Sequence, residues 1–218
     1  STLNGVRDNG TDDAHGYLIA LNGEGRRLWQ VQLCGGYGRV SALALPRRDA
    51  RAARVVAAVH SHRGANPERC TLAVLDGANG TRLAQRSFAH SLGQPRLLDS
   101  ARDVFVVGGG DHILRSFDAA LKPRARFDAG SEVEAWACVD LDGDGTNEVV
   151  ASTGREVLVL DAHLRMRGRF PHGGTSGRPI AVVPARAGPR RWRLCTCDGR
   201  AVAWDVVPVS PLRQPAPL

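Results

Sequence analysis

The chain has 218 residues with an ordinary globular composition, and no apolar run approaches the roughly 18–20 residues that span a membrane. Its net charge of +7 comes almost entirely from scattered arginines, because Lys122 is the only lysine. With only 5% aromatic residues, the sequence lacks the basic and aromatic stripe of a nucleic-acid-binding groove, so no nucleic-acid partner is expected.

Short β-branched runs alternate with glycine and aspartate turns, which predicts β-strands, and few segments show helical periodicity. One signature recurs, an apolar strand that ends in Asp or Asn before a turn. These ends are Asn22, Asp76, Asp118, Asp161 and Asp205, at spacings of 54, 42, 43 and 44 residues. A polar insertion from His60 to Arg69 accounts for the long interval. A period of about 40–50 residues is typical of a four-stranded propeller blade.

Each repeat then divides into short predicted strands. The first repeat begins at its second strand, near residues 1–4, and continues at 17–22. The second has strands at 40–45, 54–59, 71–75 and 82–88. The third has strands at 96–99, 103–107, 113–117 and 124–128, and the fourth at 135–139, 148–152, 157–160 and 166–170. The last has strands at 178–184, 191–197 and 201–206, without a clear fourth strand.

The predicted fold is therefore an all-β propeller of four-stranded antiparallel blades, with about five repeats over residues 1–207 and partial repeats at both ends. These repeats either close into a small ring or form part of a larger ring whose other blades lie outside this chain. Residues 208–218 are rich in proline and are expected to be a tail without fixed structure.

One loop carries a metal-binding pattern, with acidic residues at Asp140, Asp142, Asp144 and Glu148. Four carboxylates within nine residues repel one another unless a cation or solvent separates them. Gly145 permits a sharp bend, after which the Thr146 carbonyl and the Glu148 carboxylate complete a cage of oxygen ligands. Hard oxygen ligands in a flexible loop favour Ca²⁺ over a transition metal.

The loop differs from an EF-hand in its second half. An EF-hand needs Glu at the twelfth position, which here is Ala151, and the flanking segments are strand-like. The pattern from Asp140 to Glu148, followed by Val149 and Val150, resembles the FG-GAP/VCBS-type repeat of integrin-like propellers. That resemblance implies calcium between neighbouring strands of one blade, although the family often has Asp at the ninth position. Separately, residues 21–29 are similar to the turn and tryptophan of quinoprotein-like (PQQ-type) propeller repeats.

Other polar clusters have less specific patterns. The acidic stretch from Asp8 to Asp13 lacks the alternating spacing of a second calcium loop. His60 and His62 would form a metal pair only with further ligands, and a solvated loop is the favoured interpretation. Gly108 to Asp111 is followed by neither a helix nor Lys-Ser/Thr, so it predicts a hairpin turn rather than a phosphate loop.

Five cysteines without regular spacing argue against a disulfide-stapled scaffold, and Cys195 and Cys197 lack the second pair that a zinc site needs. Buried free thiols are the favoured interpretation. Together with the lack of a signal-like profile in the first ten residues, they favour a cytoplasmic location. Secretion, common among proteins with the repeat type that the loop resembles, is the alternative.

The leading functional interpretation is a non-catalytic propeller, stabilised by Ca²⁺ in one blade, that binds a protein or another macromolecule through its face or loops. No serine lies in a G-x-S-x-G elbow, and no catalytic constellation is recognisable. One alternative is a fragment of a propeller enzyme, a polysaccharide lyase or a quinoprotein-like enzyme, whose active site needs further segments. Another is a regulatory sensor domain of a larger intracellular signalling protein.

Overall fold

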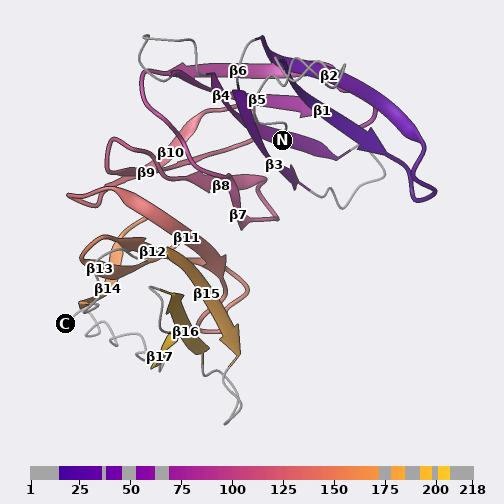
Figure 1. Cartoon of the computed structure of the whole chain (residues 1–218). Helices are drawn as coiled ribbons and strands as arrows, with labels where there is room; N and C mark the ends of the chain where they lie inside the picture. Colours follow the sequence, from indigo (N-terminus) through magenta and orange to yellow (C-terminus); the bar gives the residue numbers. More distant parts are fainter. Residues whose placement is uncertain are drawn as a thin grey trace, which may run out of the picture.

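The computed structural model describes residues 15–35, 38–45, 53–61, 69–171, 178–184, 192–197 and 201–206. In these residues the chain forms 17 β-strands in five antiparallel sheets, which follow one another along an arc from the indigo to the yellow end of the chain (Figure 1). No part of the chain described here forms a helix long and apolar enough to cross a membrane. The predicted β-propeller of four-stranded antiparallel blades is confirmed.

The sheets are meanders in which each strand pairs with the next. The first contains β1 (His15–Leu21) and β2 (Arg27–Gly35). The second contains β3 (Gly38–Leu45), β4 (Arg54–Ser61), β5 (Arg69–Asp76) and β6 (Arg82–Phe88). The third contains β7 (Arg96–Asp99), β8 (Val104–Val107), β9 (Ile113–Phe117) and β10 (Pro123–Asp128). The fourth contains β11 (Val133–Val139), β12 (Glu148–Thr153), β13 (Glu156–Leu160) and β14 (Met166–Pro171). The fifth contains β15 (Arg178–Pro184), β16 (Trp192–Cys197) and β17 (Ala201–Val206).

Several expectations fall on residues that are not described. They are the strand at 1–4, the acidic stretch 8–13, most of the insertion with His62, and the proline-rich tail 208–218. The other predicted strands are present, with bounds that differ by at most two residues at each end.

Burial separates the inner strands of each blade from the outermost one. Every residue of β8 and β12 is buried, whereas most of β6 and β10 is exposed. A middle strand has a blade on each side, so an unbroken apolar run suits it, whereas an outermost strand meets solvent along its edge. The arc places the first strands of successive blades against one another, since β3 contacts β7, β7 contacts β11 and β11 contacts β15 (Figure 1).

The hydrophobic core lies between blades rather than within one. One cluster joins the second and third sheets and includes Phe105, Phe117 and Leu72, each at most 1% exposed. Another joins the third and fourth sheets through Leu98, Trp136 and a set of aliphatic side chains. Each blade is therefore stabilised mainly by its neighbours, as in other repeat proteins.

The periodic Asp or Asn organises the turn before the last strand in each of the first four sheets. Asn22, Asp118 and Asp161 each accept two backbone N–H groups with one side-chain oxygen, at 2.8–3.0 Å. Asp76 accepts one, from Ala78 at 2.8 Å. The repeat recognised in the sequence is therefore an Asx-type turn, in which a short polar side chain replaces a backbone partner.

The same turns hold a residue in the left-handed region. Gly25 and Gly80 fill this position in the first two blades, with φ of 78° and 74°. Leu121 and Leu164 fill it in the next two, with φ of 59° and 57°, at a steric cost that glycine avoids. Both leucines are buried, at 6% and 2% exposed, so burial of the side chain offsets the backbone strain.

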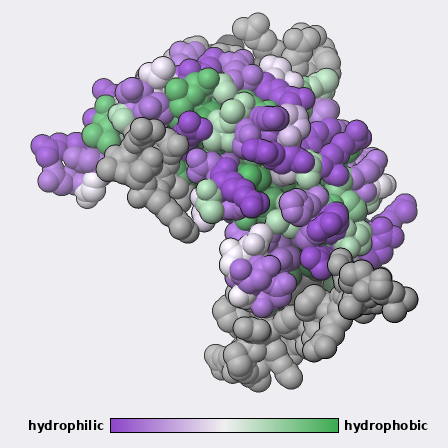
Figure 2. All heavy atoms as spheres, turned by 180° about the vertical axis from the view of Figure 1, so that it is seen from behind, coloured by the Kyte–Doolittle hydropathy of each residue, from purple (hydrophilic) through white to green (hydrophobic). Residues whose placement is uncertain are grey.

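The meander topology gives each blade two different ends. Turns after the first and third strands lie at one end, which we call the hairpin face. Turns after the second strand, and the connections between blades, lie at the other end, which we call the crossover face. In Figure 2 the visible side of the molecule is mainly hydrophilic, with hydrophobic areas in its upper part.

Candidate functional site

The acidic loop connects β11 to β12 on the hairpin face, and Asp140 organises it. Asp140 Oδ1 accepts the N–H groups of Gly143 at 2.6 Å and Asp144 at 3.1 Å, and its Oδ2 accepts that of Gly145 at 2.9 Å. Gly143 and Gly145 have φ of 79° and 86°, a conformation that favours glycine. The loop is thus curled around one carboxylate.

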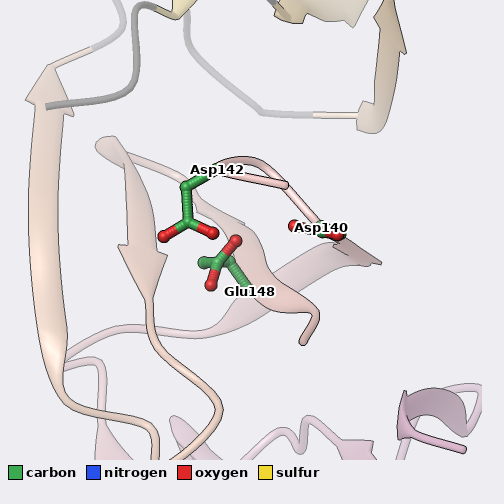
Figure 3. A group of neighbouring side chains, drawn as sticks. All are labelled: Asp140, Asp142 and Glu148. Atoms are coloured by element: carbon green, nitrogen blue, oxygen red, sulfur yellow. The ribbon is translucent and has the colours of Figure 1, made fainter. Parts of the chain in front are cut away.

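Three acidic side chains of the loop come together (Figure 3). Asp140, Asp142 and Glu148 each offer a carboxylate oxygen, and these atoms lie within 4.8 Å of one another. Asp142 uses Oδ1 to accept the Asp144 N–H, and Glu148 uses Oε2 to accept the Leu141 N–H. Asp142 and Glu148 each use one oxygen in these contacts, and the second oxygen of each carboxylate carries further lone pairs that suit a cation.

Glu148 is the buried member of this cluster, at 8% exposed. Burial, and secondarily repulsion by Asp142, Asp144 and Asp140, raises the pKa of Glu148 to about 7, against the lowering effect of the Leu141 N–H. Without a cation, this carboxylate is therefore costly to keep ionised at neutral pH.

The residues fit Ca²⁺ in donor type. All candidate ligands are hard oxygens on a glycine-containing loop, and Ca²⁺ takes about 6–8 oxygens, including carbonyls and water, in flexible geometry. Of the five residues expected from the sequence, Asp140, Asp142 and Glu148 are grouped, whereas Asp144 is exposed and lies outside this group. Thr146 donates its N–H to Asp144 Oδ1 at 2.7 Å, which closes the turn.

The loop also reaches the neighbouring blade. Asn147 Nδ2 donates to the carbonyl of Leu97, in β7 of the third sheet, at 3.4 Å. The sequence indicated a loop that stabilises one blade. The structure shows that the same loop also contacts the preceding blade. The conformation of the loop is therefore coupled to the packing between these two blades.

A second feature, which the sequence did not indicate, is a cavity of about 200 Å³ on the crossover face. Its walls come from three successive blades: the start of β3 and end of β4, the glycine turns of the third sheet, and the start of β11. Ser91 to Gly93 pairs with Gly108 to Gly110 through Gly93 N–H to Gly108 O at 2.9 Å and Gly110 N–H to Ser91 O at 3.1 Å. Only the glycines were recognisable in the sequence, as the predicted hairpin turn between β8 and β9.

Trp136 packs against this glycine turn. A Cβ on Gly93 would overlap the far edge of the indole, and one on Gly108 would lie 2.9 Å from it. We expect Gly93→Ala to lower the free energy of unfolding by about 1–3 kcal/mol, because the glycine backbone or the buried indole must shift to relieve this overlap. Urea denaturation would measure this change, and Gly23→Ala, which meets no atom within 4 Å, is the matched control. Equal effects of the two substitutions would contradict the packing argument.

Other candidate residues have structural roles. His60 lies at the end of β4, opposite Arg39 of β3, while its predicted partner His62 lies outside the described residues. Cys34 and Cys70 are buried free thiols, as expected from the sequence, and Cys138 is also free. Burial raises the pKa of Cys70, and it raises that of Cys138 to about 12, so neither is poised as a nucleophile.

Comparison with known proteins identifies the fold but not a family. No protein-family model matches the chain, and no curated protein matches it. The structure is similar to the crystal structure of BBS1N in complex with ARL6DN, with a TM-score of 0.66 and 12% identity over 89% of this chain and 59% of that one. It is also similar to Raptor from Chaetomium thermophilum, with a TM-score of 0.59 and 15% identity over 90% of this chain and 18% of that one.

The chain therefore spans 59% of the length of the BBS1N chain and 18% of the Raptor chain. These neighbours are β-propellers, and their likeness extends over most of the present arc. Together with the sheet order, it shows that this chain forms successive blades of a β-propeller.

Proposed function

We propose that this chain is a non-catalytic β-propeller module that binds a protein partner, and that Ca²⁺ fixes the loop from Asp140 to Glu148. In this proposal the loop is a calcium-binding turn of the FG-GAP/VCBS type, placed between two strands of one blade. The cation has a structural role, since it would neutralise three neighbouring carboxylates and hold the β11–β12 hairpin.

The observation that supports partner binding is the likeness to BBS1N, a propeller crystallised in complex with ARL6DN. A propeller presents two faces built from turns, and these can vary while the strands beneath them keep their packing. A protein partner on one of these faces is the function that suits such an arrangement best.

The observation that supports calcium is the grouping of Asp140, Asp142 and Glu148 within 4.8 Å. Carboxylates at this distance repel one another, and a buried one such as Glu148 costs most when ionised. A divalent cation would convert this repulsion into attraction and would leave the backbone hydrogen bonds of the loop in place.

Thermal unfolding tests the calcium part. At Ca²⁺ of about 100 times the Kd, binding adds about 2.7 kcal/mol, which corresponds to a rise in Tm of about 5–10 °C over a sample in EDTA. Mg²⁺ at equal concentration is the control, because it demands a tighter octahedral shell. An unchanged Tm, together with no bound metal in elemental analysis, would refute the calcium site.

Photo-crosslinking in the source cells tests partner binding. A benzophenone side chain would replace Gly110 on the crossover face, Ala78 on the hairpin face, or Leu83 on an exposed outer strand. We expect one discrete protein to be captured from a turn-bearing face and not from Leu83. If no position captures a discrete protein, a protein-binding role is wrong.

A further inference from the structure

The cavity on the crossover face carries an inference about the chemistry of the partner, which rests on the proposed protein-binding function. We propose that this cavity takes a cationic side chain, arginine or lysine, of a protein partner, held by Glu132 and Glu134 beside Trp136. The cavity has the size of one side chain, and two acidic side chains without partners among the described residues and a tryptophan lie in its lining.

Size selects the class of occupant. The cavity measures about 200 Å³, below the range of about 300–1,000 Å³ that is typical of sites for drug-sized ligands. One long side chain fits such a space, whereas a nucleotide or quinone cofactor does not. A protein partner would insert one of its side chains into this cavity while the rest of the partner stays outside.

One wall of the cavity has the chemistry of a cation site. Glu132, which directly precedes β11, and Glu134 and Trp136, in the first half of that strand, all line the cavity. Carboxylates form charge-assisted hydrogen bonds with guanidinium and ammonium groups, and an indole attracts the same cations through its ring. The three side chains therefore favour one type of ligand.

The two glutamates differ from the other acids of the described stretch 69–171. Every other acidic side chain in the described stretch 69–171 takes part in a hydrogen bond, an ion pair or an electrostatic interaction, as when Asp118 pairs with Arg124 at 3.0 Å and Glu156 with Arg169 at 3.0 Å. In that stretch only Glu132 and Glu134 have neither hydrogen bonds nor ion pairs, and both are exposed at the cavity. The chain has 29 basic and 22 acidic residues, and within the stretch 69–171 this pair of carboxylates has no basic partner among the described groups.

Trp136 supplies a further sign of an incomplete site. The residue is 8% exposed, and its Nε1–H is buried without a hydrogen-bond partner among the described groups. Buried indole N–H groups usually have a partner. Trp136, which lines the cavity together with Glu132 and Glu134, thus retains an unused donor among the described groups.

The lining of the cavity also includes a positive charge. Arg39, from the start of β3, is exposed and lines the cavity from the second sheet, whereas Glu132 and Glu134 line it at the start of the fourth. A basic ligand side chain is expected against β11, with the carbonyl or carboxylate groups of its peptide toward Arg39. Because the Debye length is about 8 Å at physiological salt, these local charges outweigh the net charge of the whole protein.

Nuclear magnetic resonance of the indole N–H groups tests the proposal directly on the full chain. The chain has four tryptophans, and Trp136→Phe assigns the Trp136 signal. The probes are acetylated, amidated pentapeptides with arginine, lysine, citrulline or glutamate between glycines. We expect saturable shifts of the Trp136 signal with arginine or lysine, and none with citrulline, which has nearly the shape of arginine without its charge.

Substitution of the acids provides the second arm. Glu132→Gln with Glu134→Gln should weaken binding of the arginine peptide at least about tenfold, because the charge-assisted hydrogen bonds are lost. Both residues are exposed, so Tm should stay within the small range typical of surface changes. Glu24→Gln, exposed in the β1–β2 hairpin, is the matched control and should leave binding unchanged.

The outcomes separate this inference from the proposed function. Equal shifts with citrulline and arginine, or no shift with any peptide, would overturn the cationic site. If crosslinking at Gly110 or Ala78 nevertheless captures a partner, the protein-binding role stands without this specificity. If the peptide binds as expected and crosslinking captures nothing, the cavity is a cation site and the protein-binding function fails.

Discussion

Asp161→Ala is expected to lower the free energy of unfolding by about 3 kcal/mol, the largest effect among the turn residues. Asp161 is 5% exposed and accepts the N–H groups of His163 and Arg165 and the Nε–H of Arg165, at 2.8–2.9 Å. Loss of the two amide contacts costs about 1 kcal/mol each, as at a helix cap, and loss of the ion pair with the exposed Arg165 adds up to about 1 kcal/mol. Urea denaturation measures the total.

Two further variants identify the cause. Asp161→Asn keeps the oxygen that accepts the turn amides and removes the charge, so it should cost about 1 kcal/mol, the part due to the ion pair. Asp76→Ala removes a single amide contact from a less buried residue and should also cost about 1 kcal/mol. Amide exchange should accelerate first in β13 and β14 for Asp161→Ala. Uniform acceleration over all blades would contradict a local turn effect.

Glu148→Gln is expected to weaken Ca²⁺ binding by about 100-fold. Substitution of residues that only support a metal ligand already costs about 10–100-fold in metal affinity, and Glu148 is expected to be a ligand itself. The amide keeps an acceptor for the Leu141 N–H and loses the charge that the cation would meet. In EDTA at pH 8 the same variant should be more stable than the native chain, since a buried, repelled carboxylate is replaced by a neutral group. Calorimetric titration and thermal unfolding measure the two effects, and Glu24→Gln should change neither.

The pH dependence of the calcium-free protein has a defined sign. The pKa of Glu148 is raised from 4.5 to about 7, so the folded state binds this proton more tightly than the unfolded chain. Its contribution to stability is complete below pH 4.5 and is lost as the pH rises to about 7. Glu148→Gln should remove this slope. If the native chain and the variant have parallel profiles in EDTA, Glu148 does not titrate as described.

The fold could be predicted because each of its determinants is local in sequence. A strand, its terminal Asp or Asn and the following turn are contiguous, so Asp118 and Asp161 marked their blades correctly. The acidic loop is likewise a single segment, and its carboxylates were recognisable from their spacing. The spacing of the acidic residues did not predict on which side of the loop each carboxylate lies. In the structure Glu148 lies with Asp140 and Asp142, and Asp144 lies outside this group.

Two further features that the sequence did not reveal lie between blades. The cavity combines Arg39, Gly93, Gly109 and Glu134, which come from segments separated by tens of residues. Asn147 and Leu97 are 50 residues apart and meet only because blades pack side by side. A repeat of about 40–50 residues predicts that such contacts exist, but which side chains meet depends on the exact twist and offset of neighbouring sheets.

The turn built on Asp or Asn also bears on how such proteins diverge. Either residue supplies the required oxygen, and the left-handed position accepts glycine in some blades and a buried leucine in others. The strands between turns need only apolar side chains of suitable size, a demand that many sequences meet. Sequences that differ at most positions can therefore form this architecture, in agreement with a TM-score of 0.66 at 12% identity. The geometry of its turns therefore characterises this architecture more directly than the identity of its residues does.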